Sequence, residues 1–362
     1  MAPLDIEEFN SWESLTAYRQ QWNDLVDQQQ LGPAHEFSWL ETVWNVNRAN
    51  RELLVILFSD SDGVAGIASF VKETEKRRGL LVQILKPLAW FHSLHGTQLI
   101  FARDPQLLLN TLFEYLNKKH NDWVLWFTQY KRGEEQESMF ASALQQRGYP
   151  FESHAGVRSP YLRIEETWDE KMKTLQPRFR TALRSREKRL REKGPFELRF
   201  LDSADEWQAG LDAIREIEGD SWKVAAGSAI TVQDFQWRFY CRYAPLAAKC
   251  GTLRIPVLYL DGEPLAYDYA IYDRGIYYLL KTSYRQKWQE MYPGFVLRKL
   301  MVEWAYSQCA TEIDFLGKDE DWKMKWTSTV REHTEFYTFN RNWSALYLRG
   351  MRRIGSLLQH KG

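Results

Sequence analysis

Three apolar strands follow one another with only short turns between residues 253 and 283, and this run constrains the fold more than any other feature. The segments 253–260, 264–272 and 275–283 are rich in β-branched and aromatic side chains, and Asp261-Gly262 and Asp273-Arg274-Gly275 separate them. Turns this short connect only antiparallel neighbours. A helical pattern over 295–307 and a strand pattern over 312–316 come next. We therefore predict a mixed α+β sheet that is neither a doubly wound parallel sheet nor a β/α barrel.

The length of the chain indicates two domains, because 362 residues are more than one ordinary hydrophobic core takes. The first half alternates helical stripes, over 14–30 and 38–47, with a hairpin pattern over 53–58 and 64–71. The periodicity stops between residues 151 and 160, and we place the boundary there. We predict a first lobe over 1–155, a second over 156–340, and a basic amphipathic tail helix over 341–362.

Charge and cysteine content exclude several classes of protein. The 48 basic side chains balance the 48 acidic ones, so no net field favours DNA. The three cysteines form no CxxC pair, which argues against disulfides and zinc, and we expect no metal cofactor. The first residues lack the apolar core of a signal peptide, and no apolar stretch reaches the roughly 20 residues of a membrane helix. A cytoplasmic location is expected.

A helix start after the third strand is the best candidate for a ligand site. The polar segment 284–290 leads to Tyr292-Pro293-Gly294 and then to the helical pattern. Proline suits the first helical turn, and glycine lets a ligand approach the backbone. Free N–H groups at a helix start favour a phosphate or pyrophosphate. On these residues alone, an ordinary Pro–Gly helix start without a ligand is the commoner case.

An ordered set of motifs resembles the GNAT-type acyltransferases. Gln289-x-x-Tyr292-x-Gly294 is similar to the loop that holds the coenzyme A pyrophosphate in those enzymes, with Tyr292 in place of the first glycine. The set as a whole resembles the CelD-like and FemAB-like branch. Its further members are Arg178-x-Arg180-x3-Arg184-x-Arg186, Trp222-Lys223, Gly262-x-Pro264-x-Ala266, Asp314-Phe315-x-Gly317 and Lys323-x2-Trp326. The first lobe resembles that branch too, through the helix with Phe37-x-Trp39 and the hairpin after it.

This resemblance implies a fold and a reaction. The fold is two tandem GNAT-like lobes, each a mostly antiparallel sheet flanked by helices, with the active site in the second lobe. The reaction is transfer of an acyl group from acyl-CoA to a small-molecule or glycan amine by direct attack, in polysaccharide or cell-envelope metabolism. Two alternatives remain. One is a FemAB-like transferase that takes its aminoacyl group from tRNA, and the other is a non-catalytic scaffold in an exopolysaccharide system.

Six residues are candidates for the chemistry. Asp314 ends a buried strand and is a candidate base or amine-orienting group, or else a turn carboxylate. Asp268 lies among aromatic residues in a strand, where a carboxylate must be paired or perturbed unless it faces outward. Lys281 on the next strand could pair with Asp268. Lys323 is a candidate phosphate or carboxylate ligand, or a solvated lysine. Tyr284 is a candidate hydroxyl donor to the leaving thiol, as is Tyr292.

The remaining candidates are binding residues. For the donor the resemblance implies Gln289, Tyr292, Pro293, Gly294, Phe295, Arg178 and Arg180. For the acceptor it implies Glu218, Trp222, Lys223 and Trp326.

Two basic segments keep two interpretations each. Residues 171–193 hold ten Lys or Arg against two Glu. They form either a solvated helix or an arm that meets the 3′-phosphate of coenzyme A, a carrier protein or tRNA. The tail helix either packs on its lobe or contacts a partner or a membrane surface, which would make the protein peripheral at the inner membrane.

Overall fold

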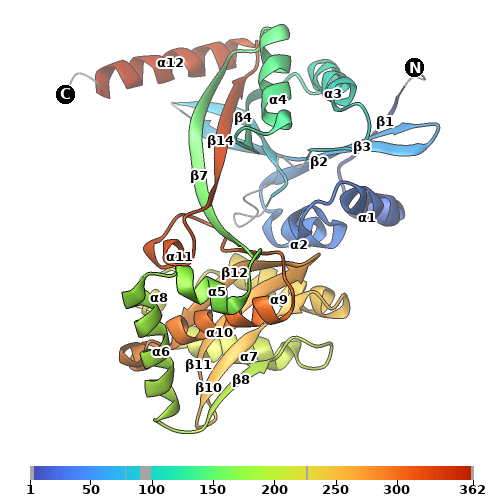
Figure 1. Cartoon of the computed structure of the whole chain (residues 1–362). Coiled ribbons are helices and arrows are strands. Elements are labelled where there is room, and N and C mark those ends of the chain that lie inside the picture. The colour runs from blue at the N-terminus through green and yellow to red at the C-terminus, as the bar shows by residue number, and fades with distance from the viewer. Residues whose placement is uncertain (1–3, 78, 90–98, 226, 360–362) are drawn as a thin grey trace. The chain divides into compact units, whose positions relative to one another are not determined.

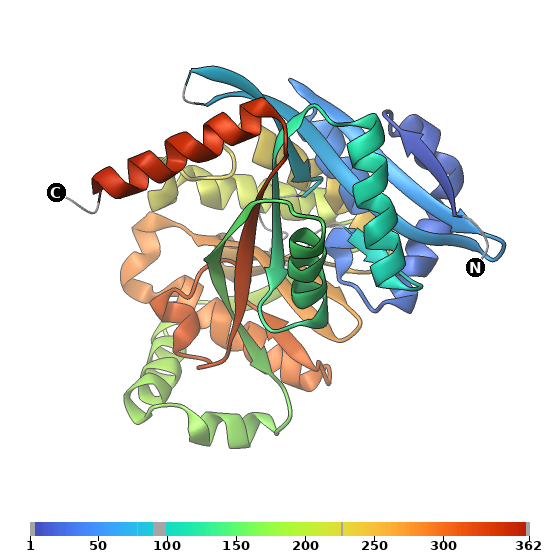
Figure 2. The same cartoon turned by 90° about the horizontal axis from the view of Figure 1, so that it is seen from above.

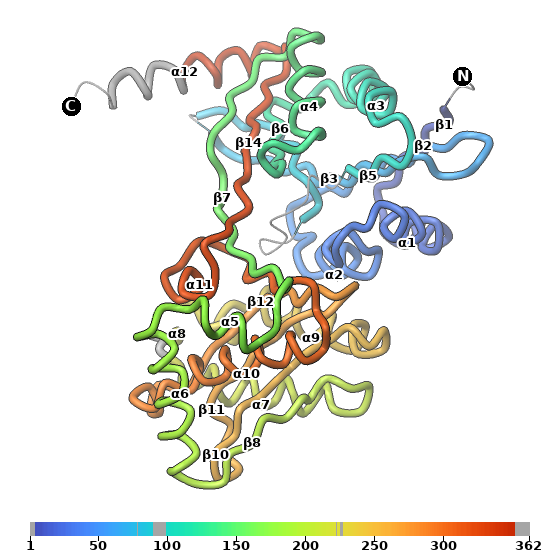
Figure 3. The backbone as a smooth tube through the Cα atoms, viewed as in Figure 1, coloured from blue at the N-terminus to red at the C-terminus, as the bar shows by residue number. Residues whose placement is uncertain are grey.

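The computed structural model describes residues 4–77, 79–89, 99–225 and 227–359, without the side chains of Trp222, Ala225 and residues 352–359. These residues form two compact units (Figure 1). Unit 1 comprises Met1–Val157 and Glu332–Gly362, and unit 2 comprises Arg158–Arg331. Two strands carry the chain from one unit to the other and back. They are β7 (Phe151–Arg163) and β14 (Val330–Phe339), which can be followed in Figure 3.

Unit 1 is built on a mostly antiparallel sheet in the order β1-β2-β3-β4-β6-β14, with β5 paired to β3. Its remaining strands are β1 (Asp5–Phe9), β2 (Arg51–Asp60), β3 (Gly63–Arg77), β4 (Leu80–Pro87), β5 (Leu99–Phe101) and β6 (Trp123–Lys131). The pair β4 and β6 is parallel. Two strands that run in parallel need a crossover between them, and helix α3 (Pro105–Lys119) provides it here.

The helices of unit 1 bury aromatic side chains against its sheet. They are η1 (Glu13–Tyr18), α1 (Arg19–Gln28), η2 (Pro33–His35), α2 (Phe37–Asn47), α3, α4 (Glu135–Gln146) and α12 (Trp343–Gln359). Phe113 of α3 and Phe140 of α4 pack on Trp126 of β6 with ring centroids 5.3 and 5.2 Å apart. Figure 2 shows α12, in red, leading to the C-terminus. In α12, Ala345 and Leu348 are buried, whereas Trp343 is 87% exposed.

Unit 2 contains the predicted meander. The strands β10 (Pro256–Leu260), β11 (Glu263–Asp273) and β12 (Ile276–Tyr284) pair in antiparallel order. Each turn has two residues of positive φ, 50° and 77° at Asp261 and Gly262 and 47° and 78° at Arg274 and Gly275. Turns of this hand match the twist of the strands, which is why Asp-Gly and Arg-Gly occur there. The mixed α+β prediction is confirmed.

The other elements of unit 2 complete one sheet and two helical layers. The sheet order is β7-β13-β12-β11-β10-β8, with β9 paired to β11. The added strands are β8 (Phe196–Phe200), β9 (Leu253–Arg254) and β13 (Glu312–Asp314). The helices are α5 (Trp168–Thr174), α6 (Pro177–Arg191), α7 (Trp207–Gly219), α8 (Trp222–Ala225), α9 (Asp234–Lys249), η3 (Gln286–Met291), α10 (Pro293–Ser307) and α11 (Asp321–Met324).

Helices α7 and α10 lie on opposite faces of this sheet, as two adjacent residues of β11 show. The Tyr267 hydroxyl donates to Glu218 of α7, and the Asp268 carboxylate accepts from Arg298 of α10. Successive side chains of a strand point to opposite faces. A buried core of aliphatic residues between the sheet, α6 and α10 includes Leu183, Leu265, Val296 and Met301.

The unit boundaries differ from the predicted lobes in two places. Residues 151–160, where the sequence shows no periodicity, belong to the continuous strand β7. Residues 334–339, predicted in the second lobe, pair with β6 and so lie in unit 1 together with α12. Both differences arise because long-range strand pairing, which leaves little local signal, decides where these segments lie. Among the described residues, no helix is long and apolar enough to cross a bilayer.

Candidate active site

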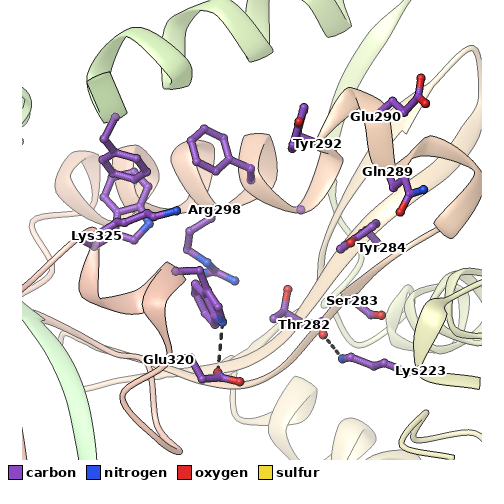
Figure 4. A pocket seen from close by; sticks show the side chains of 15 residues that line it. Lys223, Thr282, Ser283, Tyr284, Gln289, Glu290, Tyr292, Arg298, Glu320 and Lys325 are labelled. Atoms are coloured by element: carbon purple, nitrogen blue, oxygen red, sulfur yellow. Dashed lines mark hydrogen bonds between the residues drawn. The ribbon is translucent and has the colours of Figure 1, made fainter. Parts of the chain in front are cut away.

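Strands β12 and β13 part from each other, and the opening between them holds a pocket. They pair in parallel only over Ile276–Tyr278 and Glu312–Asp314. Strand β13 then ends, whereas β12 continues for six residues to Tyr284. A pocket of about 660 Å³ lies there, between the end of β12, the start of α10 and the segment that follows β13 (Figure 4). Its lining residues are Phe179, Lys223, Thr282, Ser283, Tyr284, Gln289, Glu290, Tyr292, Gly294, Phe295, Arg298, Glu320, Trp322, Lys325 and Trp326.

The start of α10 brings backbone to this pocket. Tyr292 precedes the helix in the left-handed region, with φ 55° and ψ 46°, and Pro293 occupies the first helical turn. A Cβ at Gly294 would lie 3.1 Å from Cδ1 of Tyr284. Only glycine therefore leaves the Tyr284 ring in place, whereas the close approach of a ligand, which the sequence predicted, stays a prediction. Tyr292 takes the strained conformation that a glycine would adopt more easily.

Few main-chain donors remain free in this turn. The N–H of Tyr292 donates to the Gln289 carbonyl, and those of Phe295 and Val296 donate to the Tyr292 carbonyl. Pro293 has no N–H group. Gly294 is thus the main-chain donor of residues 292–296 for which no bond within the described chain is recorded. Gln289 lines the pocket and accepts from Gln286 at 2.6 Å.

Helix α6 completes the aromatic wall on this side. The guanidinium carbon of Arg186 lies 3.7 Å from the ring centroid of Tyr292 and 4.2 Å from that of Phe295. Phe179 packs edge-on against Phe295 and Trp326, at 5.4 and 5.1 Å. This arrangement places Tyr292, Phe295 and Trp326, all predicted binding residues, on one pocket. The guanidinium of Arg186 thus lies over two aromatic rings of the pocket, although Arg186 itself does not line it.

The other two arginines predicted for the donor lie differently. Arg180 donates to the carbonyls of Met172 and Lys173 and so closes the end of α5. Arg178 is exposed on α6 and does not line the pocket. Of the basic segment, Phe179 lines the pocket, and Arg186 contacts the pocket residues Tyr292 and Phe295 from outside it.

Asp268 is fully buried and is held by Arg298, not by Lys281. Its carboxylate accepts from Arg298 at 2.6 Å and from the Tyr277 hydroxyl at 3.1 Å. Asp268 is opposite Thr282 in the register, and Lys281 is opposite Tyr269. The side chains of adjacent residues alternate between faces, so Lys281 points away from Asp268 and the proposed pair cannot form. Two Arg298 nitrogens, Nε and Nη1, are buried without a partner in the described residues.

Lys223, from α8, reaches the pocket from the opposite face. Its ammonium donates to the Thr282 carbonyl and lies 3.9 Å from Glu218. Glu218 is fully buried and also accepts from the Tyr267 hydroxyl and the Ile230 N–H. Burial lowers the pKa of Lys223, although Glu218 opposes that shift. Trp222 begins α8, but its side chain lies outside what the structure describes.

Lys281 is a half-buried cation on the same face as Lys223. Burial, and then the charge of Lys223, lower its pKa from 10.5 to about 8. Its register partner Tyr269 donates to the Tyr240 carbonyl of α9. Lys281 thus lies on the α7 and α9 side of the sheet, beside the pocket wall formed by Lys223 and Ser283.

Asp314 and Lys323 shape the segment after β13 and do not line the pocket. Asp314 accepts from the Leu316 N–H at 2.9 Å and from Arg331 at 3.0 Å. Lys323 is 5% exposed and donates to the carbonyls of Leu316 and Lys318. The two residues hold a turn in which Leu316 and Gly317 have positive φ. The structure thus favours the turn-carboxylate interpretation of Asp314. Lys323 is a buried lysine whose ammonium is bonded to carbonyl groups of the loop.

Several pocket residues escaped the sequence analysis, and Arg298 is the clearest. It lies four residues after Gly294, on the buried face of α10 with Leu297, Met301 and Val302. A charged residue on the apolar face of a helix is a signal that helical periodicity could have revealed. The short segment with Glu320 and Trp322 has no periodicity, so no comparable signal existed there. Glu320 accepts from Trp322 Nε1 at 3.1 Å (Figure 4).

Comparisons with known proteins agree with this geometry. Residues 177–324 match the family model described as "Acetyltransferase (GNAT) domain". The match covers less than half of the chain and lies entirely in unit 2. It includes the whole pocket except Trp326 and Lys325, so the GNAT domain contains β12, α10 and the opening beside β13. The predicted acyltransferase class is confirmed.

Solved structures share the fold across both units. FemX matches with 15% identity and a TM-score of 0.50, over 92% of this chain and 98% of that one. L-PGS from Bacillus licheniformis matches with 14% identity and a TM-score of 0.51, over 92% and 95%. A conserved protein of unknown function from Bacteroides thetaiotaomicron matches with 13% identity and a TM-score of 0.51, over 94% and 100%. No curated protein sequence matches this chain. The FemAB-like, two-lobed fold is confirmed.

Proposed function

We propose that the GNAT domain transfers an acyl group from an acyl-CoA thioester to an amine, with the pocket as the site of transfer. The observation that carries the proposal is the opening between β12 and β13, which meets the Gly294 turn of α10 in a pocket of about 660 Å³. An acyl thioester is long, apolar at one end and anionic at the other. The aromatic wall suits the acyl and pantetheine parts, and Arg186 with the Gly294 N–H suits the phosphates.

The free edge of β12 supplies donors for the reaction. The Arg285 N–H donates to the Leu265 carbonyl of β11. Antiparallel strands alternate the direction of their N–H groups, so those of Thr282 and Tyr284 point to the edge that β13 has left. Donors fixed there can stabilise the oxyanion that forms when the amine nitrogen attacks the thioester carbonyl.

Proton movements complete the proposed mechanism. A C–N bond forms and the C–S bond breaks, the amine loses a proton and the leaving thiolate gains one. Tyr284 lines the pocket on the free edge and is our candidate donor to the thiolate. Glu320 is our candidate acceptor of the amine proton, because it is the pocket carboxylate on the β13 side. Asp314 acts indirectly, by holding the turn that precedes Glu320, whereas Lys323 also contacts the Glu320 carboxylate directly, at 3.0 Å.

The test is binding followed by transfer. Calorimetric titration with acetyl-CoA and longer acyl-CoA should show saturable binding, and thiol release should depend on an added amine. Gly294→Val, which fills the turn, should weaken both about 100-fold while the chain stays folded by circular dichroism. Failure of every acyl-CoA to bind at millimolar concentration would remove coenzyme A as the donor.

A second donor is favoured by one observation. Only one main-chain donor of residues 292–296 remains for a pyrophosphate, and Tyr292 replaces a loop glycine. An aminoacyl-tRNA, as used by FemAB-like transferases, needs no pyrophosphate cradle. In that case the chain should form a complex with aminoacyl-tRNA that nuclease destroys and that weakens steeply with salt. Acyl-CoA would then not compete with the tRNA.

A further inference from the structure

Polar groups that the proposed donor site does not use lie on the face of β12 opposite to α10, where Ser283 lines the pocket and Lys281 lies beside it. Ser283 and Lys281 lie two residues apart and therefore point to the same face. Their register partners are Tyr267 and Tyr269, whose hydroxyls bond to α7 and α9. Ser283 and Lys281 thus face the α7 and α9 layer, about 7 Å apart along the strand.

Lys223 brings a third donor to the same place. Its ammonium bonds to the carbonyl of Thr282, the residue between Lys281 and Ser283 (Figure 4). Lys223 and Ser283 both line the pocket. We call Lys223, Lys281 and Ser283 the lysine–serine cluster.

The hydrogen-bonding capacity of this cluster is largely unspent. Ser283 is 4% exposed, and its buried hydroxyl has no partner among the described residues. Lys281 makes no recorded hydrogen bond or ion pair within the same part of the chain. Unpaired buried polar groups cost free energy, and proteins rarely keep them without a use.

The charges of the cluster are also unbalanced. Glu218 is the carboxylate whose charge acts on both ammonium groups, Lys223 and Lys281, and it already accepts from Tyr267 and from a main-chain N–H. The charges of Glu320 and Asp268 act on Lys223. The lowered pKa of Lys281 agrees with this imbalance, since burial and Lys223 both disfavour its charged form. An added anion would relieve both effects.

We propose that the lysine–serine cluster binds an anionic group, phosphate or carboxylate, of the amine acceptor. The proposal rests on the proposed function and adds to it the class of acceptor, an amine that also carries an oxyanion. The position of the cluster indicates that the anion belongs to the amine acceptor and not to the acyl donor. The aromatic wall, Gly294 and Arg186 lie on the α10 side with the donor, and the cluster lies across β12 from them.

Binding of simple anions tests the proposal directly. Inorganic phosphate and succinate, titrated separately, stand for the two sources of the oxyanion, and binding is followed by the melting temperature and by calorimetry. We expect one or both to bind saturably. We expect Lys281→Met and Ser283→Ala each to weaken that binding at least tenfold. Lys193→Met, at an exposed lysine just after α6, is the control and should leave the affinity unchanged.

Two control measurements, of the melting temperature and of acyl-CoA binding, separate a lost anion site from a folding defect or a lost donor site. Lys281→Met removes an uncompensated charge, so its melting temperature without ligand should rise, and its affinity for acetyl-CoA should equal that of the wild type. Phosphate should stay bound when coenzyme A is saturating. The proposal is overturned if neither anion binds, if the cluster variants bind as well as the wild type, or if coenzyme A displaces the anion. Loss of acyl-CoA binding alone would refute the proposed donor and leave the anion site standing.

Discussion

The two units contain the same crossing, strand to helix to parallel strand, yet they end it differently. In unit 1, β4 stops at Pro87, two residues after its last pair with β6 at Leu85. In unit 2, β12 runs six residues beyond its last pair with β13 at Tyr278. The longer overhang leaves the opening that holds the pocket. A pocket of about 70 Å³ lies beside β5 and β6 in unit 1, against about 660 Å³ in unit 2.

The helix starts differ in the same sense. Both α3 and α10 follow a residue in the left-handed region and have proline in the first turn. In α3 that residue is Asp104, whose carboxylate accepts from the Leu107 N–H and so occupies the place of an anionic ligand. In α10 it is Tyr292, which makes no side-chain cap, and Gly294 follows. The comparison indicates that this strand–helix–strand unit forms a ligand site only where no side chain caps the start of its helix.

The largest expected effect concerns the buried pair under the pocket. Arg298→Met leaves Asp268 as an unpaired buried carboxylate, and we expect the free energy of unfolding to fall by about 3–5 kcal/mol. Asn110, at the matching place in α3, is only partly buried. Asn110→Met should therefore change the free energy of unfolding by less than about 1 kcal/mol. Urea denaturation measures both. Equal losses at the two positions would mean that the helices are not as different as described.

The second effect concerns activity. Gly294→Val should lower kcat/KM about 100-fold, because the new side chain meets the Tyr284 ring and displaces the donor. Gln106→Val places a valine at the matching position of α3 and should leave kcat/KM within a factor of two. Steady-state kinetics at fixed amine concentration compares them. A comparable loss in Gln106→Val would place part of the reaction in unit 1.

The third effect depends on pH. Lys281 has a pKa of about 8 in the folded chain against 10.5 otherwise, so the folded chain binds its proton less tightly. Its charge therefore destabilises the fold fully below about pH 8, and the penalty fades as the pH rises from 8 to 10.5. Lys281→Met should raise the free energy of unfolding by roughly 2–3 kcal/mol at pH 7, with the gain disappearing towards pH 10.5.

A paired lysine in unit 1 gives the matched control. Lys86 contacts Glu73 at 2.5 Å and Glu75 at 2.7 Å. Lys86→Met should therefore lower the free energy of unfolding at pH 7, by about 0.5–1 kcal/mol. Denaturation curves at pH 7, 8, 9 and 10 compare the two variants. A stability loss in Lys281→Met at pH 7 would contradict the assigned burial of an unpaired charge.

The smallest effect lies at the residues before the two helices. Tyr292→Gly relieves a left-handed strain of about 1–2 kcal/mol and loses a cation–π contact with Arg186 worth about 0.5–1 kcal/mol. The net gain should be about 1 kcal/mol or less. Asp104→Ala should instead cost about 1 kcal/mol, because it removes the cap of α3. Thermal unfolding in parallel detects opposite signs, and the same sign for both would break the comparison.

Local patterns predicted the meander, the helix after it and the Gly294 turn, because neighbouring residues determine each of these features. The predicted pair of Asp268 with Lys281 does not form, because the register of β11 and β12 places the two side chains on opposite faces of the sheet. The sequence of either strand alone does not reveal this register or the bulge in it. The strand β7 was missed for the same reason, since its partners are distant in sequence. Arg298 was within reach of helical periodicity, whereas Glu320 and Trp322 lie in a short segment held by tertiary contacts, which include those of Asp314 and Lys323.

Photolabelling with a donor analogue tests the central claim, that unit 2 alone holds the acyl-donor site. A coenzyme A thioester with a diazirine in the acyl group is irradiated with the full chain, and peptide mass spectrometry locates the label. We predict labels within residues 282–295 and 320–326 and at Phe179, all suppressed by excess unlabelled acyl-CoA and absent in Gly294→Val. Suppressible labelling of α3 or of β6 in unit 1, with none in these segments, would contradict the account.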